Sequence, residues 1–486
     1  MNQQPITNIG DTIDKSIDLD KIAVIDLSKS LPDHISYRDL DILSNSIARG
    51  LVKKNIRIGD KIAIIANNSI EYAATFFGVL RLGAVPVLIN FKLTNNQIRQ
   101  ILIESESKFI FSDNDINYDI ETIRFDQDFK SFCDVGEFEI YQPKKDDIAF
   151  LLYTSGSYNS PKGAVITHAG HSWALQGYKE KIGLHLGTKA VPLISAPLYH
   201  ANGLTTFESS ICIGAKIVLL PNFDAVKCLQ TIDEYRTNIV YAVPTMLAMM
   251  VQEKELIEKL NLSSLKVIAM ASSPLSNKLI ENIKKAFPSG KIYNNYGITE
   301  VGSGLFGIEE NCPEGSVGYP REGIEYRLVD RILQIKSPSM MTSYYKQDKN
   351  NSITEDGFFI TNDLFEIDEN GYYYFIGRAD DIFKCGGNKV NPREVERILE
   401  SHPAVAISAV IALDDDIKGK KPYAFVVLEK GKTASQEELI EHSLNNGPAY
   451  QHPRKIWFLD TMPLAGTNKI NKKYLEQLAI QLTNQK

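Results

Sequence analysis

Cysteine is scarce in this sequence, and the few cysteines present are not paired. The 486 residues include five cysteines, without a CxxC motif among them, and they stand far apart, at Cys133, Cys212, Cys228, Cys312 and Cys385. Disulfide frameworks and structural zinc sites need paired and regularly spaced cysteines, so we expect neither. A reducing compartment fits this usage best, and we expect a cytoplasmic protein.

The sequence also lacks an excess of basic residues and a long uninterrupted apolar run. Its formal net charge of -7 gives no general electrostatic reason to bind nucleic acid or an anionic membrane. The first residues contain no basic segment followed by an apolar one, so we expect no secretory signal. The most apolar window, residues 72–91, is interrupted by Arg81 and Pro86. We expect it to form a buried helix, a turn at Gly83 and a buried strand, and not a membrane span.

Short apolar segments alternate with helical patterns through most of the chain. Strands are expected at 61–67, 85–90, 108–113, 216–221, 238–244 and 265–272, and helices at 95–105, 245–258 and 276–287. Strands separated by helices of this length indicate βαβ units and largely parallel sheets with covered faces. From about residue 316, short strands joined by tight turns are more typical of an antiparallel sheet or a small barrel.

A smaller α+β segment follows residues 377–381. It contains a predicted helix beginning near Pro392, strands at 405–413 and 423–429, a helix at 435–445 and a strand at 455–460. A chain of 486 residues exceeds what one hydrophobic core usually organises. We therefore predict two domains, residues 1–379 and 380–486, with the boundary at Asp380.

The segment "TSGSYNSPKG", residues 154–163, directly follows an apolar run at 148–153. Backbone N–H groups of such a Gly/Ser-rich turn can converge on phosphate oxygens, and hydroxyls and a lysine add further donors. It is not a Walker A loop, because Gly163 follows Lys162 where that motif has Ser or Thr. By itself the segment is equally compatible with a solvated loop.

Several further polar segments follow predicted strands. They lie at 294–300, 357–363, 375–381 and 466–475, and they contribute Thr299, Glu300, Asp363, Arg378, Asp380 and Lys469. Each residue alone has an ordinary structural interpretation as a helix cap, a turn residue or a surface lysine.

In this order and at these separations, the segments resemble the core motifs of the ANL superfamily of adenylate-forming enzymes. This superfamily comprises acyl- and aryl-CoA synthetases, adenylation domains of peptide synthetases and beetle luciferases. The likeness extends from about residue 35 to residue 475, and the segments 153–163, 296–300 and 377–396 are together highly specific. It implies an α/β fold, with a large N-terminal domain of two α/β sheet layers plus a small β-barrel, and a smaller, mobile α+β C-terminal lid.

The resemblance implies a two-step reaction that uses ATP and Mg²⁺. A carboxylic acid attacks the α-phosphate of ATP and forms an acyl-adenylate and pyrophosphate, after which a thiol attacks the acyl group and AMP leaves. The thiol belongs to CoA in an acid–CoA ligase, or to the phosphopantetheine of an acyl carrier protein in a stand-alone adenylating enzyme. A degenerate, non-catalytic nucleotide-binding member is a third alternative, disfavoured because the motif residues Thr299, Glu300, Asp363, Arg378 and Lys469 are retained.

The resemblance also implies roles for individual residues toward the nucleotide. The phosphate loop would supply Thr154, Ser155, Gly156, Ser157 and Lys162 to the β- and γ-phosphates, whereas Ser272, Ser273 and Tyr296 would flank the adenine. Thr299 would bind the α-phosphate, and Glu300 would be the protein ligand of Mg²⁺. Asp363 would accept both ribose hydroxyls, with Arg378 nearby.

The remaining implied roles concern the acid and the lid. Lys469 would stabilise charge on the carboxylate and the α-phosphate during adenylation. The lid would hinge at Asp380, withdraw Lys469 and bring Gly386 and Gly387 to line a pantetheine tunnel. His200 matches an aromatic position beside the acyl pocket, where it would gate or pack and not shuttle a proton. No histidine in the sequence has metal-ligand spacing, so we assign Glu300 alone to a metal.

Three positions depart from the family pattern in the same way. Asn159, Asn362 and Asn468 stand where the family usually has glycine. Asparagine is among the non-glycine residues that best tolerate a positive φ, so we hypothesise that the backbone path is kept at all three sites. Tyr158 in the phosphate loop, which replaces a hydroxyl-bearing small residue, has no comparable explanation.

The acid is only partly restricted by the sequence. Family members that activate α-amino acids usually carry an Asp just after the position of His200, and this chain has Ala201 there. A free α-amino group is therefore not expected to be recognised. The segment 202–210 would line the acyl pocket, and its small residues would admit an aryl or medium-length acyl group. We expect Glu208 on the helix surface or behind the pocket, and not in contact with the acid.

Overall fold

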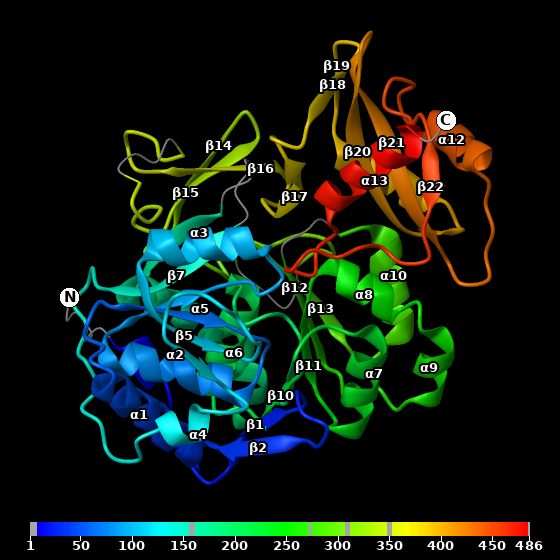
Figure 1. Ribbon diagram of the computed structural model, residues 1–486. Coiled ribbons are helices and arrows are strands. Elements are labelled where there is room, and N and C mark those ends of the chain that lie inside the picture. Colours follow the sequence, from blue (N-terminus) through cyan, green and yellow to red (C-terminus); the bar gives the residue numbers. More distant parts are fainter. Residues whose placement is uncertain (1–6, 155–160, 272–274, 307–311, 348–351, 485–486) are drawn as a thin grey trace.

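The structure is a computed structural model that describes residues 7–154, 161–271, 275–306, 312–347 and 352–484. It is a mixed α/β protein with a large N-terminal domain and a smaller C-terminal one, which confirms the predicted fold class (Figure 1). Among the described residues, no helix is both long enough and apolar enough to cross a membrane.

The first sheet of the large domain has six strands in the order β6-β5-β3-β4-β7-β8. The strands are β3 (Lys61–Ile65), β4 (Val85–Leu88), β5 (Ser107–Ser112), β6 (Thr122–Arg124), β7 (Ile148–Thr154) and β8 (Lys162–Thr167). All neighbours pair in parallel except β7 and β8, which are antiparallel and flank the predicted phosphate loop. The sheet therefore presents both ends of that loop at one edge.

The second sheet has seven strands in the order β13-β12-β11-β9-β10-β1-β2. They are β1 (Ile22–Asp26), β2 (Asp33–Ser36), β9 (Pro192–Ile194), β10 (Ile217–Leu219), β11 (Ile239–Ala242), β12 (Val267–Ala271) and β13 (Lys291–Asn295). Only β1 and β2 pair antiparallel. The predicted segment 294–300 therefore begins at the carboxyl end of β13.

Helices surround these two sheets. They are α1 (Tyr37–Lys53), α2 (Ile70–Leu82), α3 (Asn95–Ser105), α4 (Phe129–Phe132), α5 (His168–Leu186), α6 (Ala201–Cys212), α7 (Ala225–Glu234), α8 (Pro244–Met250), α9 (Lys254–Lys259) and α10 (Asn277–Ala286), with short 3₁₀ turns η1 (Ile9–Asp11) and η2 (Gly187–Lys189). The apolar window contains buried α2, then Gly83 in a left-handed conformation with φ of 78°, then β4, as the sequence predicts. The single helix expected at 245–258 is wrong, because α8 and α9 are separate helices.

A four-stranded antiparallel sheet follows where a sheet or small barrel was expected. It contains β14 (Glu325–Val329), β15 (Ile332–Lys336), β16 (Phe359–Ile367) and β17 (Tyr373–Arg378), in that order. Its inner side chains join the largest apolar core of the N-terminal domain through Phe365 and Tyr373. The core thereby supports Asp363 and Arg378, which face each other on β16 and β17.

The C-terminal lobe comprises the elements after β17. It has β18 (Phe383–Cys385), β19 (Asn388–Val390), β20 (Val405–Asp415), β21 (Gly419–Leu428) and β22 (Ile456–Phe458), with helices α11 (Pro392–Ser401), α12 (Gln436–Asn446) and α13 (Lys472–Asn484). The sheet order is β19-β18-β21-β20, and β22 pairs with β21. Asp380, the predicted hinge, lies in the short link between β17 and β18.

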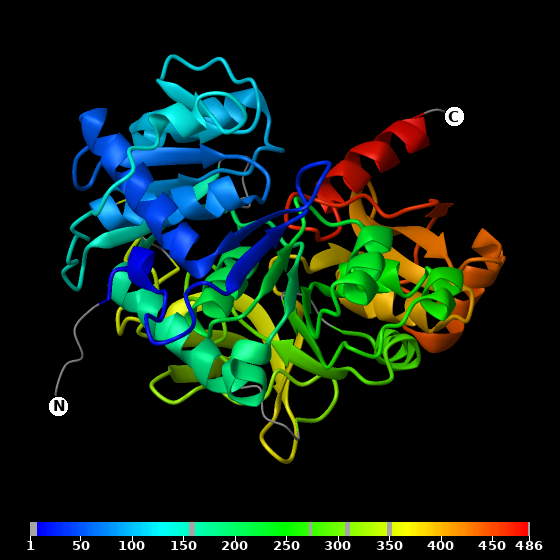
Figure 2. The ribbon, with the colours of Figure 1, turned by 90° about the horizontal axis from the view of Figure 1, so that it is seen from below.

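The C-terminal lobe packs on the large domain at α8 and α10 (Figures 1 and 2). Ala248 of α8 and Leu279 of α10 join an apolar cluster with residues of β20 and β21. Lys278 Nζ donates to the carbonyls of His402 at 2.9 Å and Val405 at 2.5 Å. These contacts hold the C-terminal lobe in one orientation over the carboxyl end of the seven-stranded sheet.

Candidate active site

A tight hairpin of the C-terminal lobe carries Lys469 to the large domain. Leu464 and Ile470 pair across this Lys469 hairpin, residues 463–471. Ala465 N donates to Lys469 O at 2.7 Å, and Asn468 N donates to Ala465 O at 2.9 Å. The closing residue Asn468 is left-handed, with φ of 59°. This conformation lets the chain reverse within a few residues, and Lys469 follows directly after the turn.

Lys469 lies among charged groups of the large domain. Burial lowers the pKa of Lys469, and the charges of Asp363 and Glu300 oppose that effect. The positive charge of Arg378 lowers the pKa of Lys469 as well. The structure thus brings together four of the predicted site residues, which come from β16, β17, the turn after β13 and the Lys469 hairpin.

Asp363 is almost completely buried, with 2% of its surface exposed. The Tyr296 hydroxyl donates to Asp363 Oδ2 at 2.6 Å, and Arg378 Nη1 lies 3.4 Å from Oδ1. Burial nevertheless raises the pKa of Asp363 to about 6, because desolvation outweighs the opposing charge of Arg378. A buried carboxylate with both oxygens toward donors can accept two hydroxyls of a ribose.

Arg378 connects Asp363 to the link between the two lobes. Its Nε and Nη2 atoms donate to the carboxylate of Asp380 at 2.9 and 3.0 Å, in a two-point contact. Burial opposes ionisation, but Asp380 and Asp363 together raise the pKa of Arg378 above its usual value. The hinge residue expected from the sequence is therefore held by a site residue in this orientation.

Tyr344 joins Glu300 to the end of the phosphate loop. Its hydroxyl donates to Glu300 Oε1 at 2.9 Å, and Lys162 Nζ lies 5.1 Å from the centre of its ring. The segment of Tyr344 runs beside β8, where Tyr345 N donates to Gly163 O at 2.7 Å. Sequence reasoning missed Tyr344, because nothing in its immediate neighbours indicates a contact with Glu300.

His200 caps the N-terminus of α6. Its Nδ1 accepts the N–H of Asn202 at 3.5 Å. Burial, together with the smaller effect of the nearby Lys469 charge, lowers the pKa of His200 to about 4. His200 is therefore neutral near pH 7, a state that suits packing or gating better than proton transfer with an imidazolium.

Thr154 and Thr299 also lie at predicted positions. Thr154 ends β7, and its hydroxyl is 3.5 Å from Lys162 O. Thr299 lies in the turn after β13, directly before Glu300. The predicted residues Ser155, Gly156, Ser157, Ser272 and Ser273, together with Tyr158 and Asn159, lie outside the described residues.

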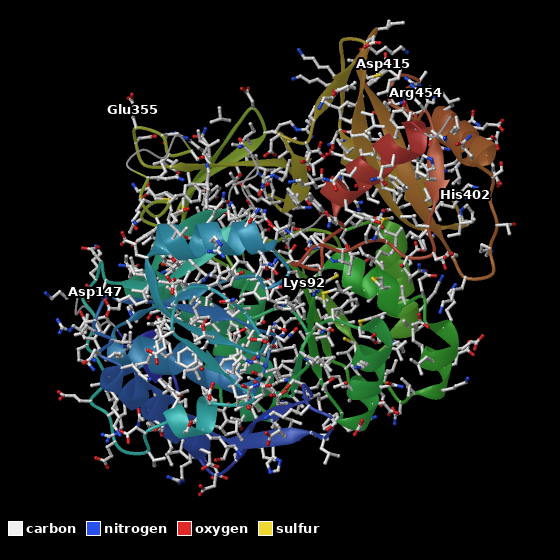
Figure 3. All side chains as sticks on the ribbon, viewed as in Figure 1. Lys92, Asp147, Glu355, His402, Asp415 and Arg454 are labelled. Atoms are coloured by element: carbon white, nitrogen blue, oxygen red, sulfur yellow. The ribbon has the colours of Figure 1, made fainter. Side chains whose placement is uncertain are left out.

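Two predicted glycines lie far from this cluster. Gly386 and Gly387 form the turn between β18 and β19 with φ of 57° and 87°, at the outer end of the C-terminal lobe (Figure 1). Gly386 N donates to Lys418 O at 2.9 Å. Asp415, labelled in Figure 3, marks the same outer end, since it pairs with Gly419 beside Cys385.

The asparagine hypothesis is confirmed at the two positions that the structure describes. Asn362 and Asn468 both have φ of 59°, in the left-handed region that glycine usually occupies. Asn362 precedes Asp363, and Asn468 precedes Lys469. The two left-handed residues therefore set the direction in which the chain presents the Asp363 carboxylate and the Lys469 side chain.

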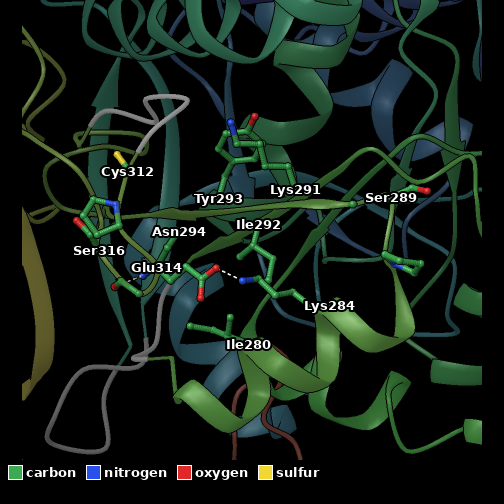
Figure 4. Close-up of a pocket in the computed structure, with 14 residues that line it drawn as sticks. Ile280, Lys284, Ser289, Lys291, Ile292, Tyr293, Asn294, Cys312, Glu314 and Ser316 are labelled. Atoms are coloured by element: carbon green, nitrogen blue, oxygen red, sulfur yellow. Dashed lines mark hydrogen bonds and ion pairs between the residues drawn. The ribbon is translucent and has the colours of Figure 1, made fainter.

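A separate cleft of about 350 Å³ lies on the outer side of β13 (Figure 4). Its lining includes Lys291 and Tyr293 of β13, and Lys284 of α10, which forms an ion pair with Glu314. Asn294 donates to Gly315 O at 2.9 Å and fastens the opposite wall to β13. None of the charged residues around Lys469 lines this cleft, so it is distinct from the candidate active site.

The comparisons with known proteins match nearly the whole chain. The sequence model of the AMP-binding enzyme family matches residues 16–345, and that of the AMP-binding enzyme C-terminal domain matches residues 394–469. 2-Succinylbenzoate–CoA ligase of Bacillus subtilis (strain 168) is 29% identical over 463 residues, which cover 91% of this chain and 93% of the relative. 4-Coumarate–CoA ligase-like 2 of Arabidopsis thaliana is 28% identical and covers 91% of this chain and 86% of the relative.

Solved structures agree with these relatives. The anthranilate CoA ligase AuaEII in complex with anthranoyl-AMP has a TM-score of 0.87 and 26% identity, covering 99% of this chain and 98% of its own. o-Succinylbenzoate CoA synthetase of Bacillus subtilis in complex with its acyl-adenylate has a TM-score of 0.81 and 28% identity, covering 97% and 98%. With a family model over more than half of its length, this chain belongs to the AMP-binding enzymes, within the adenylate-forming superfamily that its motifs resemble.

Proposed function

We propose that this protein is an AMP-forming acid–CoA ligase. The observation that carries the proposal is the docked Lys469 hairpin, which places one lysine among Asp363, Arg378 and Glu300 on the large domain. That arrangement suits a reaction in which a carboxylate approaches the α-phosphate of ATP and negative charge must be stabilised. The CoA ligases among the relatives support the acceptor.

In the first step, a carboxylate oxygen of the acid forms a bond to the α-phosphorus, and the bond from that phosphorus to the β-phosphate oxygen breaks. Lys469 would contact the acid carboxylate and the α-phosphate as charge increases there. Thr299 would donate to the α-phosphate. Asp363, flanked by Tyr296 and Arg378, would hold the ribose hydroxyls. Pyrophosphate leaves without any proton transfer, so a neutral His200 is consistent with this step.

Glu300 fits the part of a single protein ligand for Mg²⁺. Its Oε1 accepts the Tyr344 hydroxyl, and among the described residues no hydrogen bond is recorded for Oε2. Mg²⁺ usually keeps several waters and takes one or two carboxylates beside the phosphates of a nucleotide. The ion would neutralise charge on the phosphates and on the leaving pyrophosphate. Lys162, beside Tyr344, would contact the same phosphates.

The predicted residues outside the described part of the chain complete the nucleotide site in this proposal. Ser155, Gly156 and Ser157 would bind the β- and γ-phosphates, because β7 and β8 hold both ends of their loop beside Lys162. Ser272 and Ser273 would flank the adenine, because β12 ends at Ala271 beside β13.

The second step needs the C-terminal lobe in a different orientation. The sulfur of CoA would form a bond to the acyl carbon, the bond from that carbon to the AMP oxygen would break, and the thiol proton would go to solvent. Gly386 and Gly387 would line the path of the pantetheine arm after the lobe rotates about Asp380. We accordingly propose Asp380 as the boundary between domains 1–379 and 380–486.

The acid that we propose is an aryl or medium-length carboxylic acid without a free α-amino group. Ala201 begins α6 beside His200, so no carboxylate stands there to bind an ammonium group. The names of the relatives, which include anthranilate, succinylbenzoate and coumarate ligases, support aryl acids as the first candidates.

We propose the cytoplasm as the compartment. All five cysteines, from Cys133 to Cys385, are free thiols, and free thiols persist in reducing compartments. Fractionation of cells that produce the tagged protein tests this directly, and recovery with an organelle fraction would contradict it.

The proposed function is tested by measuring ATP–pyrophosphate exchange with a panel of acids. The panel would contain 4-coumarate, benzoate, anthranilate, 2-succinylbenzoate and straight-chain fatty acids, with phenylalanine as the amino-acid control. We expect exchange with at least one aryl or medium-length acid, none with phenylalanine, and conversion to a CoA thioester when CoA is added. Transfer to a holo-carrier protein in preference to CoA would overturn the proposed acceptor, and absence of exchange with every acid would overturn the activity.

A further inference from the structure

Tyr199 connects the large domain to the Lys469 hairpin by one hydrogen bond. Its hydroxyl donates to the carbonyl of Gly466 at 2.8 Å, across a sequence separation of 267 residues. Tyr199 is 4% exposed and lies in the turn between β9 and α6, directly before His200. The bond is therefore partly buried, and it lies directly beside His200.

The surroundings of this bond leave the tyrosine ring little freedom. Phe91 packs edge-on against it, with ring centres 5.7 Å apart. On the other side of the contact, Gly466 packs against Asn90. A Cβ on Gly466 would lie 2.2 Å from Asn90 Nδ2, while Asn90 Oδ1 is held by the N–H of Lys92 at 2.9 Å. The hairpin can approach this closely only because residue 466 is glycine.

The carbonyl that Tyr199 binds belongs to the same turn that presents Lys469. Ala465 and Asn468 close this turn through the backbone bonds described above. A second contact, from Asn468 Nδ2 to Met246 Sδ at 3.7 Å, holds the opposite side of the turn on α8. Fixing Gly466 therefore fixes the position of the Lys469 backbone relative to Asp363 and Glu300.

We propose that Tyr199 is a positioning residue for adenylation. Its hydroxyl holds the Lys469 hairpin in place on the large domain, so that Lys469 meets the reacting carboxylate and α-phosphate. The hydroxyl has no part in thiol transfer, because that step takes place with the hairpin withdrawn. The part of this inference that concerns reaction rates rests on the proposed function. The part that concerns the stability of the docked hairpin rests on the structure alone.

The test compares Tyr199→Phe with the unchanged protein in each half-reaction. The substitution removes the hydroxyl and keeps the ring that packs on Phe91. We expect the rate of adenylation to fall about fivefold to thirtyfold, because the hairpin loses one partly buried hydrogen bond. Transfer of the acyl group from a supplied acyl-adenylate to CoA should change by less than about twofold. In a Lys469→Ala background, Tyr199→Phe should cause no further loss of adenylation.

A second readout does not need the substrate. Hydrogen exchange of a peptide covering residues 463–471 should be about tenfold faster in Tyr199→Phe, whereas peptides of β3, β4 and β5 should be unchanged. Tyr141→Phe is the matched control. The Tyr141 hydroxyl donates to Asp147 Oδ2 at 2.6 Å on the large domain, away from the hairpin, so its loss should leave hairpin exchange and both half-reactions unchanged.

Three outcomes would overturn the proposal. They are equal slowing of both half-reactions, unchanged adenylation, or unchanged exchange of the hairpin in Tyr199→Phe. Absence of activity with every acid in the unsubstituted protein would defeat the proposed function instead. In that case the hydrogen-exchange result alone still decides whether Tyr199 holds the hairpin.

Discussion

The hydroxyl of Tyr344 donates to Glu300 Oε1 at 2.9 Å, and the same ring lies beneath Lys162. One tyrosine thus joins the proposed Mg²⁺ ligand to the end of the proposed phosphate loop. Burial, with the Glu300 charge adding to it, raises the pKa of Tyr344, so the hydroxyl stays a donor. We infer that Tyr344 fixes the orientation of the carboxylate.

Tyr344→Phe should therefore raise the concentration of Mg²⁺ that catalysis requires. The Mg²⁺ concentration for half-maximal ATP–pyrophosphate exchange should rise roughly threefold to tenfold, because the carboxylate loses one orienting hydrogen bond. Tyr345→Phe is the neighbouring control, as Tyr345 contacts Lys61 and Lys346 through its ring and should show no change. An identical Mg²⁺ profile for Tyr344→Phe would contradict the inference.

Lys469→Ala should separate the two half-reactions. Removing a charge that acts at the developing negative centre should lower the rate of adenylation by about 10²-fold to 10³-fold. Transfer from a supplied acyl-adenylate to CoA should remain within about twofold, because in the proposed second step Lys469 is withdrawn. Stopped-flow measurement of each step checks this, with Lys473→Ala on α13 as a control. Equal loss in both steps would show that the assignment of Lys469 to adenylation is wrong.

Asp363→Asn should stabilise the nucleotide-free protein while it abolishes nucleotide binding. The pKa of Asp363 is raised from 3.8 to about 6, so in the folded state this carboxyl holds its proton to higher pH than in the unfolded state. Unfolding therefore becomes easier as pH rises from about 4 to 6, by up to about 3 kcal/mol. Asn resembles the protonated form of Asp363. The gain in unfolding free energy of Asp363→Asn over the unsubstituted protein should therefore be largest at pH 7.5 and absent near pH 4. Urea unfolding at both pH values measures it.

The control for Asp363→Asn is a carboxyl with the opposite shift. The pKa of Asp356 is lowered to about 2, first through its hydrogen bond with Arg327. Asp356→Asn should therefore destabilise the protein at pH 7.5 and lose that effect as the pH falls through the range from 4 to 2. Equal stability of Asp363→Asn and the unsubstituted protein at pH 7.5 would contradict the prediction that burial of the charged Asp363 carboxylate destabilises the folded state.

Asn362→Ala should cost about 1 kcal/mol of unfolding free energy, because alanine tolerates φ of 59° poorly. Asn362→Gly should be close to neutral, since glycine adopts this conformation without strain. Asn282→Ala, inside helix α10, is the matched control and should not destabilise. Urea unfolding of all three checks the order, and a neutral Asn362→Ala would show that the backbone conformation at this site costs nothing.

Two crossed ion pairs should hold the C-terminal lobe in the orientation described. Lys254 Nζ lies 2.8 Å from Glu429 Oε2, and Lys430 Nζ lies 2.7 Å from Glu253 Oε2. Lys254→Glu should slow adenylation about twofold to fivefold at low salt, because it puts two like charges together at the lobe interface. Adding Glu429→Lys should restore the rate.

The control for this charge exchange is an ion pair within the large domain. Lys108 and Asp60 form such a pair at 2.7 Å, and Lys108→Glu should leave the ratio of the two half-reactions unchanged. Failure of the Lys254/Glu429 exchange to restore adenylation would show that these pairs do not set the orientation of the lobe.

Local sequence signals predicted those elements whose boundaries depend on neighbouring residues. Helix α3 occupies 95–105 as expected, because Thr94 and Gln97 form a capping box at its start. Gly83 ends α2 through a left-handed conformation that needs no distant contact. The helix expected at 245–258 was wrong, since its helical pattern did not reveal the break between α8 and α9.

Tyr199 and Tyr344 could not be recognised in the same way. Their hydroxyls bind Gly466 and Glu300, across separations of 267 and 44 residues. A tyrosine carries the same hydroxyl wherever it lies, and only its partner shows whether that hydroxyl serves a site. These partners are brought close by the pairing of distant strands and by the docking of the C-terminal lobe.

The sequence by itself determined which chemical groups are available, in which order they follow the strands, and where asparagine can take the place of glycine. Only the tertiary structure decided the ionisation of these groups and brought them together in one site. Burial raises the pKa of Asp363 to about 6 and lowers that of His200 to about 4, while the folded hairpin carries Lys469 across to the large domain. Both effects depend on desolvation and on the distance between charges, which are properties of space and not of position along the chain.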